Sequence, residues 1–273
     1  TRLVNFETSL HGGYRRINGY RPYDVSFETV NSSGGIGGIY GVFAFRNDAV
    51  NANEIMASRK LSASSTYEIY QYQGGIGWTP YTTGVTLSSV GVVKQRFSLF
   101  NAGAGNNVIM VDGINNALVY DGTNWYSLSS SNTGGSGSPG GDQCLNDPKF
   151  TTIFKNYVFI ASGDKIAYSA PADPLTWTVA AGSGQITPGF KVVQIKPFRD
   201  ELFVFGLNSI KKIVPDATSS FILQDVTNNL GCIASDSVLE VAGSLVFLSP
   251  DGIRPIAGTM KNNDVELDLL SED

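Results

Sequence analysis

The stretch NYVFIASGDKIAYSAP, residues Asn156–Pro171, decides the fold class. It contains the uninterrupted apolar run Val158–Ala161, then the polar turn Ser162–Asp164, and then a second apolar run that begins at Ile166. Short runs rich in β-branched and aromatic residues, joined by a tight polar turn, predict an antiparallel β-hairpin. Because the first run does not alternate with polar residues, we expect both of its faces to be covered by neighbouring sheets.

Four further hairpins of this kind occur along the chain. Their first runs are IYGVFAFR (Ile39–Arg46), NVIMVDG (Asn107–Gly113), DELFVFGLNS (Asp200–Ser209) and GSLVFLSPDG (Gly243–Gly252). When Val42, Val108, Val158, Leu202 and Leu245 are taken as equivalent positions, the spacings are 66, 50, 44 and 43 residues. Strand hairpins that repeat every ~40–50 residues are typical of β-propeller blades. Helical periodicity is nearly absent, so the sequence predicts an all-β fold, a β-propeller of about five hairpin-based repeats that can be incomplete at the chain ends.

A large aromatic residue occurs once in the later part of several repeats. The candidates for packing between blades are Trp78, Trp125, Trp177 and Phe221. A ring of this size fills the wedge between adjacent blades. The alternative interpretation is that these rings are unrelated core aromatics of a β-sandwich, and the repeat spacing favours the propeller.

The chain divides into two regions by composition. Residues 1–38 hold an N-terminal strand and a basic segment rich in Gly, Tyr and Arg, which we expect to dock onto a neighbour or to close a blade. Residues 39–273 hold the blades. Within them, residues 129–142 are rich in Ser and Gly, and we expect them to form a mobile, solvent-exposed loop.

Composition argues against several classes of protein. The 273 residues carry a net charge of −5, whereas a dedicated nucleic-acid binder usually has a strong basic excess. No apolar run approaches the ~18 residues that a membrane-spanning helix needs. Cys144 and Cys232 lie far apart and outside any C-x-x-C pair, so we expect neither a disulfide framework nor a metal site. No cofactor motif is present either, and we expect no cofactor.

Catalytic motifs are also missing, so we do not expect an enzyme. His11 is the only histidine, and it lies in an expected loop far in sequence from either cysteine. The string VYDGTNWY is close to the Asp box of propeller glycosidases, but Asp121 lies one residue too near the tryptophan. Asp112, Asp164 and Asp251 occupy the turn in three repeats, where an aspartate beside a glycine tolerates the left-handed backbone of a tight hairpin.

The most basic segment is HGGYRRINGYRPYD, residues 11–24. Its candidates for a subunit interface are Arg15, Arg16, Tyr20, Arg21 and Tyr23. Arginine and tyrosine are enriched at protein–protein interfaces, and they also stack on nucleotides. A solvated basic edge strand is the plainer interpretation, and docking onto a neighbouring subunit is the one we favour.

Three stretches resemble one protein family. They are LVNFETSLHGGYRRINGYRPYD (residues 3–24), SAPADPLTWT (Ser169–Thr178) and GCIASDSVLEVAGSLVFLSPDGIRPIAGT (Gly231–Thr259). They resemble the tail hub, or DNA-stabilisation, protein and the tail nozzle protein of short-tailed bacteriophages. The resemblance implies a propeller protomer in a sixfold ring, other tail or adaptor proteins as neighbours, and genomic DNA passing through the ring without sequence-specific binding. In that family further strands follow the element found here at Asp264–Leu267, so we expect the chain to be a fragment.

The leading functional hypothesis is therefore a structural virion protein. It would be a tail hub or nozzle subunit that forms part of the DNA-conducting channel, is made in the cytoplasm of the bacterial host, and helps to retain or eject the genome. The first alternative is a receptor- or glycan-binding propeller adhesin whose exposed Trp and Tyr stack on sugars. The second alternative is a propeller hydrolase, which needs clustered carboxylates in its central funnel.

Overall fold

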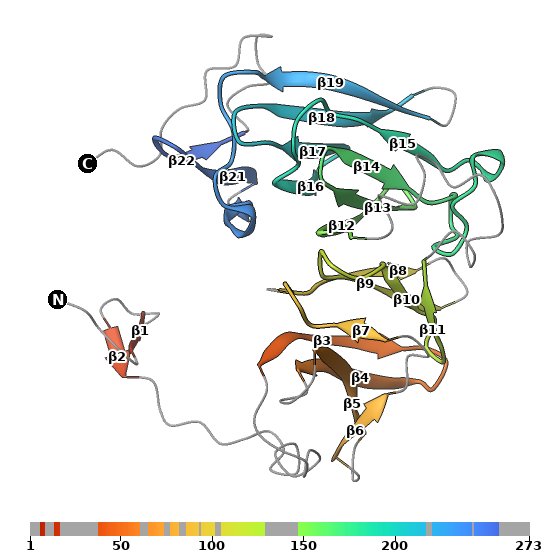
Figure 1. Cartoon of the computed structure of the whole chain (residues 1–273). Helices are drawn as coiled ribbons and strands as arrows, with labels where there is room; N and C mark the ends of the chain where they lie inside the picture. Colours follow the sequence, from red (N-terminus) through yellow and green to blue (C-terminus); the bar gives the residue numbers. More distant parts are fainter. Residues whose placement is uncertain are drawn as a thin grey trace.

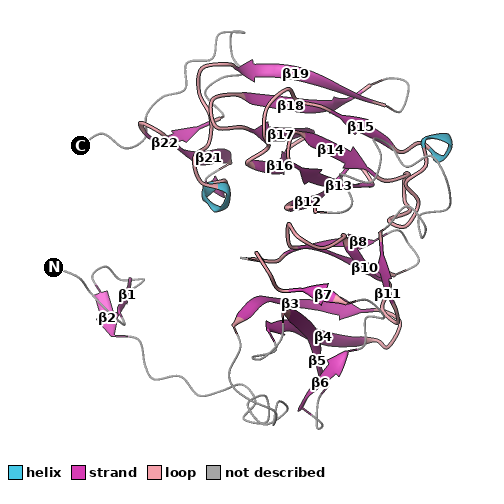
Figure 2. Cartoon of the chain, in the orientation of Figure 1, coloured by secondary structure: helices cyan, strands magenta, loops and turns pink. Residues whose placement is uncertain are grey.

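The computed structural model describes residues 6–8, 14–16, 38–60, 65–73, 77–81, 86–92, 94–101, 105–128, 147–216, 220–241 and 243–256. Nearly every element among them is a β-strand, and two short 3-10 helices, η2 (Val179–Ala181) and η3 (Ser235–Ser237), are the exceptions in this part of the chain (Figure 2). The predicted all-β class is confirmed. In the same residues no helix has the length and apolar character needed to cross a membrane.

The strands form a hairpin and five antiparallel sheets in chain order. The hairpin pairs β1 (Phe6–Thr8) with β2 (Tyr14–Arg16). The first sheet has β3 (Ile39–Asn47), β4 (Ala52–Lys60), β5 (Thr66–Gln73), β6 (Gly77–Tyr81) and β7 (Leu87–Ser88), which pairs with β5. The second sheet has β8 (Arg96–Asn101), β9 (Asn106–Val111), β10 (Leu118–Tyr120) and β11 (Trp125–Ser127).

The later sheets repeat this plan of adjacent antiparallel strands. The third has β12 (Phe150–Phe154), β13 (Tyr157–Ser162), β14 (Lys165–Tyr168) and β15 (Gly184–Ile186). The fourth has β16 (Gln194–Phe198), β17 (Glu201–Phe205), β18 (Ile210–Pro215) and β19 (Phe221–Thr227). The fifth has β20 (Leu239–Val241), β21 (Ser244–Ser249) and β22 (Gly252–Pro255).

The hairpin expected within Asn156–Pro171 is present in the structure. β13 and β14 pair with Ser162 opposite Lys165, and Gly163 takes the left-handed φ of 57° in the turn between them. The side chains of β13 alternate between two cores. Val158 and Ile160 pack in a cluster shared with the second sheet, whereas Phe159 packs in a cluster shared with the fourth. Both faces of the strand are therefore covered, which explains why its sequence has no polar side.

The sheets are arranged radially, as in a β-propeller. The first strand of the third sheet, β12, contacts the first strands β8 and β16 of the two neighbouring sheets. In Figure 1 the sheets follow one another around an arc, from the orange first sheet to the blue fifth sheet. A β-sandwich would instead pack two sheets face to face. The propeller-like class that the repeat spacing predicted is confirmed.

One of the assumed equivalences between repeats is wrong. Four of the five chosen positions lie on the second strand of their sheets; these are Val108, Val158, Leu202 and Leu245. Val42 lies on the first strand, β3, and its side chain is 58% exposed. The buried second strand of this sheet is β4, with Met56 and Ala57 inside, but polar residues in its sequence, ANEIMASRK, conceal that burial. The first spacing of 66 residues arises from this error.

Large rings lie between successive sheets. Trp125 belongs to the core shared by the first and second sheets, Trp177 to the core shared by the second and third, and Phe221 packs on the core shared by the third and fourth. The centre of the Phe221 ring lies 4.9 Å from the centre of the Tyr168 ring and 5.1 Å from that of Phe159. Trp78 packs within the first sheet, against Ala57, Tyr70 and Tyr72. It therefore fills no wedge between two described sheets.

Candidate functional site

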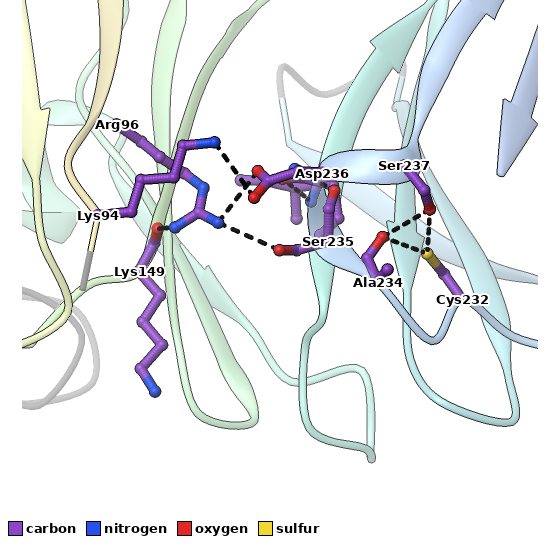
Figure 3. A network of polar contacts seen from close by, with 10 residues as sticks. Lys94, Arg96, Lys149, Cys232, Ala234, Ser235, Asp236 and Ser237 are labelled. Carbon is purple, nitrogen blue, oxygen red and sulfur yellow. Dashed lines mark hydrogen bonds and ion pairs between the residues drawn. The ribbon is translucent and has the colours of Figure 1, made fainter. Parts of the chain in front are cut away.

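A polar network joins distant sheets where they converge. This inter-sheet network consists of Lys94, Arg96, Ser235 and Asp236 (Figure 3). Lys94 Nζ lies 3.1 Å from one carboxylate oxygen of Asp236, and Arg96 Nη2 lies 3.2 Å from the other. Arg96 also donates hydrogen bonds to the Ser235 hydroxyl at 3.1 Å and to the Lys149 carbonyl at 3.3 Å. Residues about 140 positions apart in the chain are thereby held together.

The network reaches four of the five sheets. Arg96 begins β8 of the second sheet, and its guanidinium carbon lies 4.7 Å from the ring centre of Phe150 on β12 of the third. Gln194, on β16 of the fourth sheet, donates a hydrogen bond to the Ser235 carbonyl at 2.9 Å. Ser235 itself lies in η3, just before the fifth sheet. Each of these contacts opposes separation of neighbouring sheets.

Cys232 stabilises the segment that carries Asp236. Its thiol is buried and donates to the Ala234 carbonyl at 3.1 Å. The Ser237 hydroxyl donates to that carbonyl as well, at 2.6 Å, and accepts from the Leu248 amide at 3.1 Å. These bonds fix the short helix η3 that carries Asp236 (Figure 3). Cys232 therefore has a structural role, and Cys144 lies outside the described residues.

A cavity of about 300 Å³ adjoins the network, and two carboxylates line it, those of Asp112 and Asp236. Asp112 accepts a hydrogen bond from the Tyr67 hydroxyl at 2.7 Å and others from the amides of Ile114 and Asn115. Asp236 is held by its two cations. Both carboxylates are therefore engaged in contacts that hold neighbouring segments of the fold together.

Asp236 makes the stability of the fold depend on pH. Burial alone raises the pKa of Asp236, but Lys94 and Arg96 outweigh it, and the pKa lies below its usual value. A lowered pKa in the folded state stabilises the protein above about pH 4, the pKa in the unfolded chain, and this contribution disappears as the pH falls through the folded pKa. We expect Asp236→Asn to cost about 0.5–1 kcal/mol at pH 7, because half-exposed ion pairs contribute little.

Urea unfolding at pH 7 and at pH 3 tests this expectation. The difference between wild type and Asp236→Asn should be smaller at pH 3 than at pH 7, because pH 3 lies below the usual pKa of an aspartate and part of the ion-pair contribution is already lost there. A difference of the same size at both pH values would show that the ion pairs are not its cause.

A second cavity lies between the first and second sheets. It has a volume of about 460 Å³, and we call it the tyrosine pocket. Its lining residues are Val50, Ala52, Asn53, Glu54, Gln71, Tyr72, Tyr81, Tyr120, Gly122 and Thr123. They come from β4, β5, β6 and β10 and from the turns beside them. Aromatic rings beside a few polar groups are typical of ligand sites.

Glu54 is the one charged side chain among the described residues that line the tyrosine pocket. It is 6% exposed, and its Oε1 atom accepts a hydrogen bond from Asn47 Nδ2 at 3.0 Å. Its Oε2 atom has no hydrogen-bond partner within the described part of the chain. Burial raises the pKa of Glu54, and the side chains of Asn47 and Gln71 oppose that shift only in part.

The predicted interface residues are placed only in part. Arg15 and Arg16 lie on β2, where Glu7 is opposite Arg15 and Phe6 is opposite Arg16. Tyr20, Arg21 and Tyr23 lie outside the described residues, as do His11 and the loop 129–142. The interface hypothesis for these five residues stays a prediction.

Two of the three turn aspartates, Asp164 and Asp251, lie in tight hairpins as expected, whereas Asp112 begins the longer connection between β9 and β10. Asp164 lies in the β13–β14 turn, and Asp251 lies in the β21–β22 turn, where Arg254 Nε donates to it at 3.0 Å. Asp112 is buried beside Tyr67. Sequence reasoning missed Glu54 and the inter-sheet network. A charged residue inside the apolar part of a strand, as in NEIMAS, is the signal that would have pointed to Glu54.

Comparisons with known proteins support the fold alone. No family profile and no curated protein matches the chain. The extracellular domain of the one-component system BT4673 from B. thetaiotaomicron has a TM-score of 0.51 at 11% identity, covering 86% of this chain and 28% of that chain. An oxidoreductase from Thermus thermophilus, described as a glucose dehydrogenase, has a TM-score of 0.42 at 11% identity, covering 86% of this chain and 82% of that one. This chain thus spans well under two thirds of the BT4673 domain.

Proposed function

We propose that the chain is a non-catalytic structural propeller, a hub or nozzle subunit in the tail of a short-tailed bacteriophage. It would form part of the DNA-conducting channel as one member of a ring, beside other tail or adaptor proteins, and would help to retain or eject the genome. The net charge of −5 fits this role, because a wall without a cationic excess does not hold passing DNA by counterion release.

The observation that supports the proposal is the structural role of residues in the stretches that resemble phage tail proteins. Trp177, in SAPADPLTWT, is completely buried and donates from Nε1 to the Pro174 carbonyl at 2.9 Å. Ser169 is equally buried, and its hydroxyl accepts from the Val158 amide at 3.0 Å. Asp236, in the last stretch, ties η3, just before the fifth sheet, to β8 of the second. These residues stabilise the fold, as a shared structural role requires.

Exposed apolar side chains on the first and fifth sheets, the two ends of the arc, also fit assembly with other subunits. Apolar side chains are exposed on the first strand of the first sheet and on the fifth sheet; they are Ile39, Val42, Leu239, Val241 and Ile253. Exposed apolar side chains gathered on one element are typical of protein–protein contact surfaces. In the proposed assembly, neighbouring segments cover them.

Charge reversal in the basic segment tests the proposal. We expect Arg15→Glu combined with Arg16→Glu to weaken self-association by about tenfold or more, which corresponds to about 1.4 kcal/mol. The reason is that interface arginines contribute strongly and their reversal adds repulsion. Analytical ultracentrifugation gives the association constant, and particle images give the symmetry.

The control for this double variant is Lys155→Glu, which removes an exposed cation that pairs with Asp200 within the blade region. Its association should equal that of wild type. A wild-type chain that remains monomeric at every concentration, or a double variant that assembles normally, would contradict the interface hypothesis.

A receptor-binding propeller is the second candidate function. Trp78, Trp125 and Trp177 are at least nine-tenths buried, so none of them offers a face to a sugar. The tyrosine pocket is the observation that favours this candidate, since it combines three aromatic rings with a buried carboxylate. Binding of the chain as a single copy to host cells, lost on substitution in this pocket, would support it over the virion subunit.

A further inference from the structure

We propose that the tyrosine pocket binds an organic cation, the guanidinium or ammonium head of a basic side chain or a small amine. The inference deepens the receptor-binding candidate, on which it rests, and it does not depend on the virion proposal. It names the chemistry of the ligand and the residues that recognise it.

The first argument is the unpaired carboxylate. Glu54 is 6% exposed, and its Oε2 atom is buried without a hydrogen-bond partner among the described residues. Oε1 is held by Asn47, whose amide nitrogen also donates to the Gly122 carbonyl at 2.8 Å and whose oxygen accepts from the Ala49 amide at 2.9 Å. Asn47 therefore fixes the carboxylate and has nothing left for Oε2. A buried carboxylate without a counter-charge is costly, so a cation that enters the pocket relieves that cost.

The second argument is the aromatic wall. The Tyr120 hydroxyl donates to the Gly122 carbonyl at 2.9 Å, and the Tyr81 hydroxyl donates to the Thr123 carbonyl. Both residues line the pocket, and their rings meet edge to face with 5.5 Å between ring centres. Tyr72 completes the wall, and its ring is supported edge-on by Trp78 at 5.5 Å between ring centres. Aromatic rings around a carboxylate are the arrangement that attracts a desolvated cation.

The third argument separates a cation from a neutral sugar. A sugar hydroxyl would satisfy the lone pair on Oε2 but would leave the negative charge of Glu54 without a partner. Burial raises the pKa of Glu54, and a cation bound beside the carboxylate would lower that pKa again. A guanidinium supplies both the hydrogen bond and the charge, in a planar group that stacks on aromatic rings. The pocket of about 460 Å³ has room for it together with part of its carrier.

Calorimetric titration of the full chain tests the inference with matched ligands. N-acetyl-arginine amide carries the guanidinium, N-acetyl-citrulline amide has the same shape without charge, and methyl glucoside represents a neutral sugar. We expect the arginine derivative to bind about tenfold or more tightly than the citrulline derivative. Glu54→Gln should abolish this preference, whereas Glu68→Gln, which removes an exposed carboxylate on the neighbouring strand β5, should retain it.

The same titration with a peptide of residues 11–24 tests whether the cation comes from the basic segment of another copy of the chain. Tighter, Glu54-dependent binding of this peptide than of the arginine derivative would assign the ligand to the basic segment of another copy, while the reverse order would assign it to a small amine or another partner. Equal binding of the arginine and citrulline derivatives, or glucoside binding that survives Glu54→Gln, would contradict the proposed cation specificity. Either result would still be compatible with the receptor-binding candidate. No binding of any probe would overturn both.

Discussion

Replacement of Trp177 by alanine is expected to lower the free energy of unfolding by about 3–5 kcal/mol, the range for large rings removed from a packed core. Trp177 is fully buried between the second and third sheets, against residues such as Phe100 and Ile160. Its indole nitrogen also donates to the carbonyl of Pro174, the residue that follows the Ala170–Asp173 bridge. The substitution therefore opens a cavity at a boundary between sheets and frees the loop that follows β14.

Urea unfolding followed by far-ultraviolet circular dichroism measures this loss. Trp177→Phe should cost less, because it keeps a ring in the wedge and removes only the hydrogen bond and some volume. Tyr126→Ala provides the exposed control, since Tyr126 lies on β11 with 37% of its surface accessible, and it should change stability by about 0.5 kcal/mol or less. A loss below about 1 kcal/mol for Trp177→Ala would mean that the sheets are not wedged apart by this ring.

Local hairpins could be predicted from the sequence because their signal is local. A buried strand such as Val158–Ala161 and its glycine turn lie within one short stretch, and the burial of both faces leaves a continuous apolar run. The same rule failed for the first sheet. There β4 buries Glu54, Ser58 and Arg59 in addition to apolar residues, so its burial is not visible as hydrophobicity.

The sites could not be predicted, because they depend on the radial arrangement. Arg96 and Asp236 each look like ordinary surface charges, and they meet only because the radial arrangement brings η3, which lies between the fourth and fifth sheets, close to β8 of the second. The tyrosine pocket likewise combines Glu54 of the first sheet with Tyr120 of the second. Repeat spacing fixes the order of the sheets but not the angle between them, and that angle decides which side chains meet.

Gly231 provides a second large effect, because alanine at this position has no room. The Cβ atom of an alanine would lie closer than 3.0 Å to the Gly206 carbonyl oxygen and to backbone atoms of Leu207. Backbone atoms cannot rotate aside as a side chain can, so the chain around Gly231 must shift. That shift breaks the hydrogen bond from the Cys232 amide to the Gly206 carbonyl, now 2.8 Å long, and moves Cys232 out of the core between the fourth and fifth sheets.

We therefore expect Gly231→Ala to destabilise the protein by about 3 kcal/mol, at the upper end for overpacking in a core. Gly38→Ala is the matched control, because its Cβ would meet nothing within 4 Å. Urea midpoints of the two variants test the difference, and hydrogen exchange shows where protection is lost. Exchange should quicken first in β20–β22, since Gly231 precedes that sheet and Cys232 anchors it. Equal midpoints for both variants would show that the backbone at Gly206 and Leu207 yields without cost, and that the close approach does not hold the fifth sheet in place.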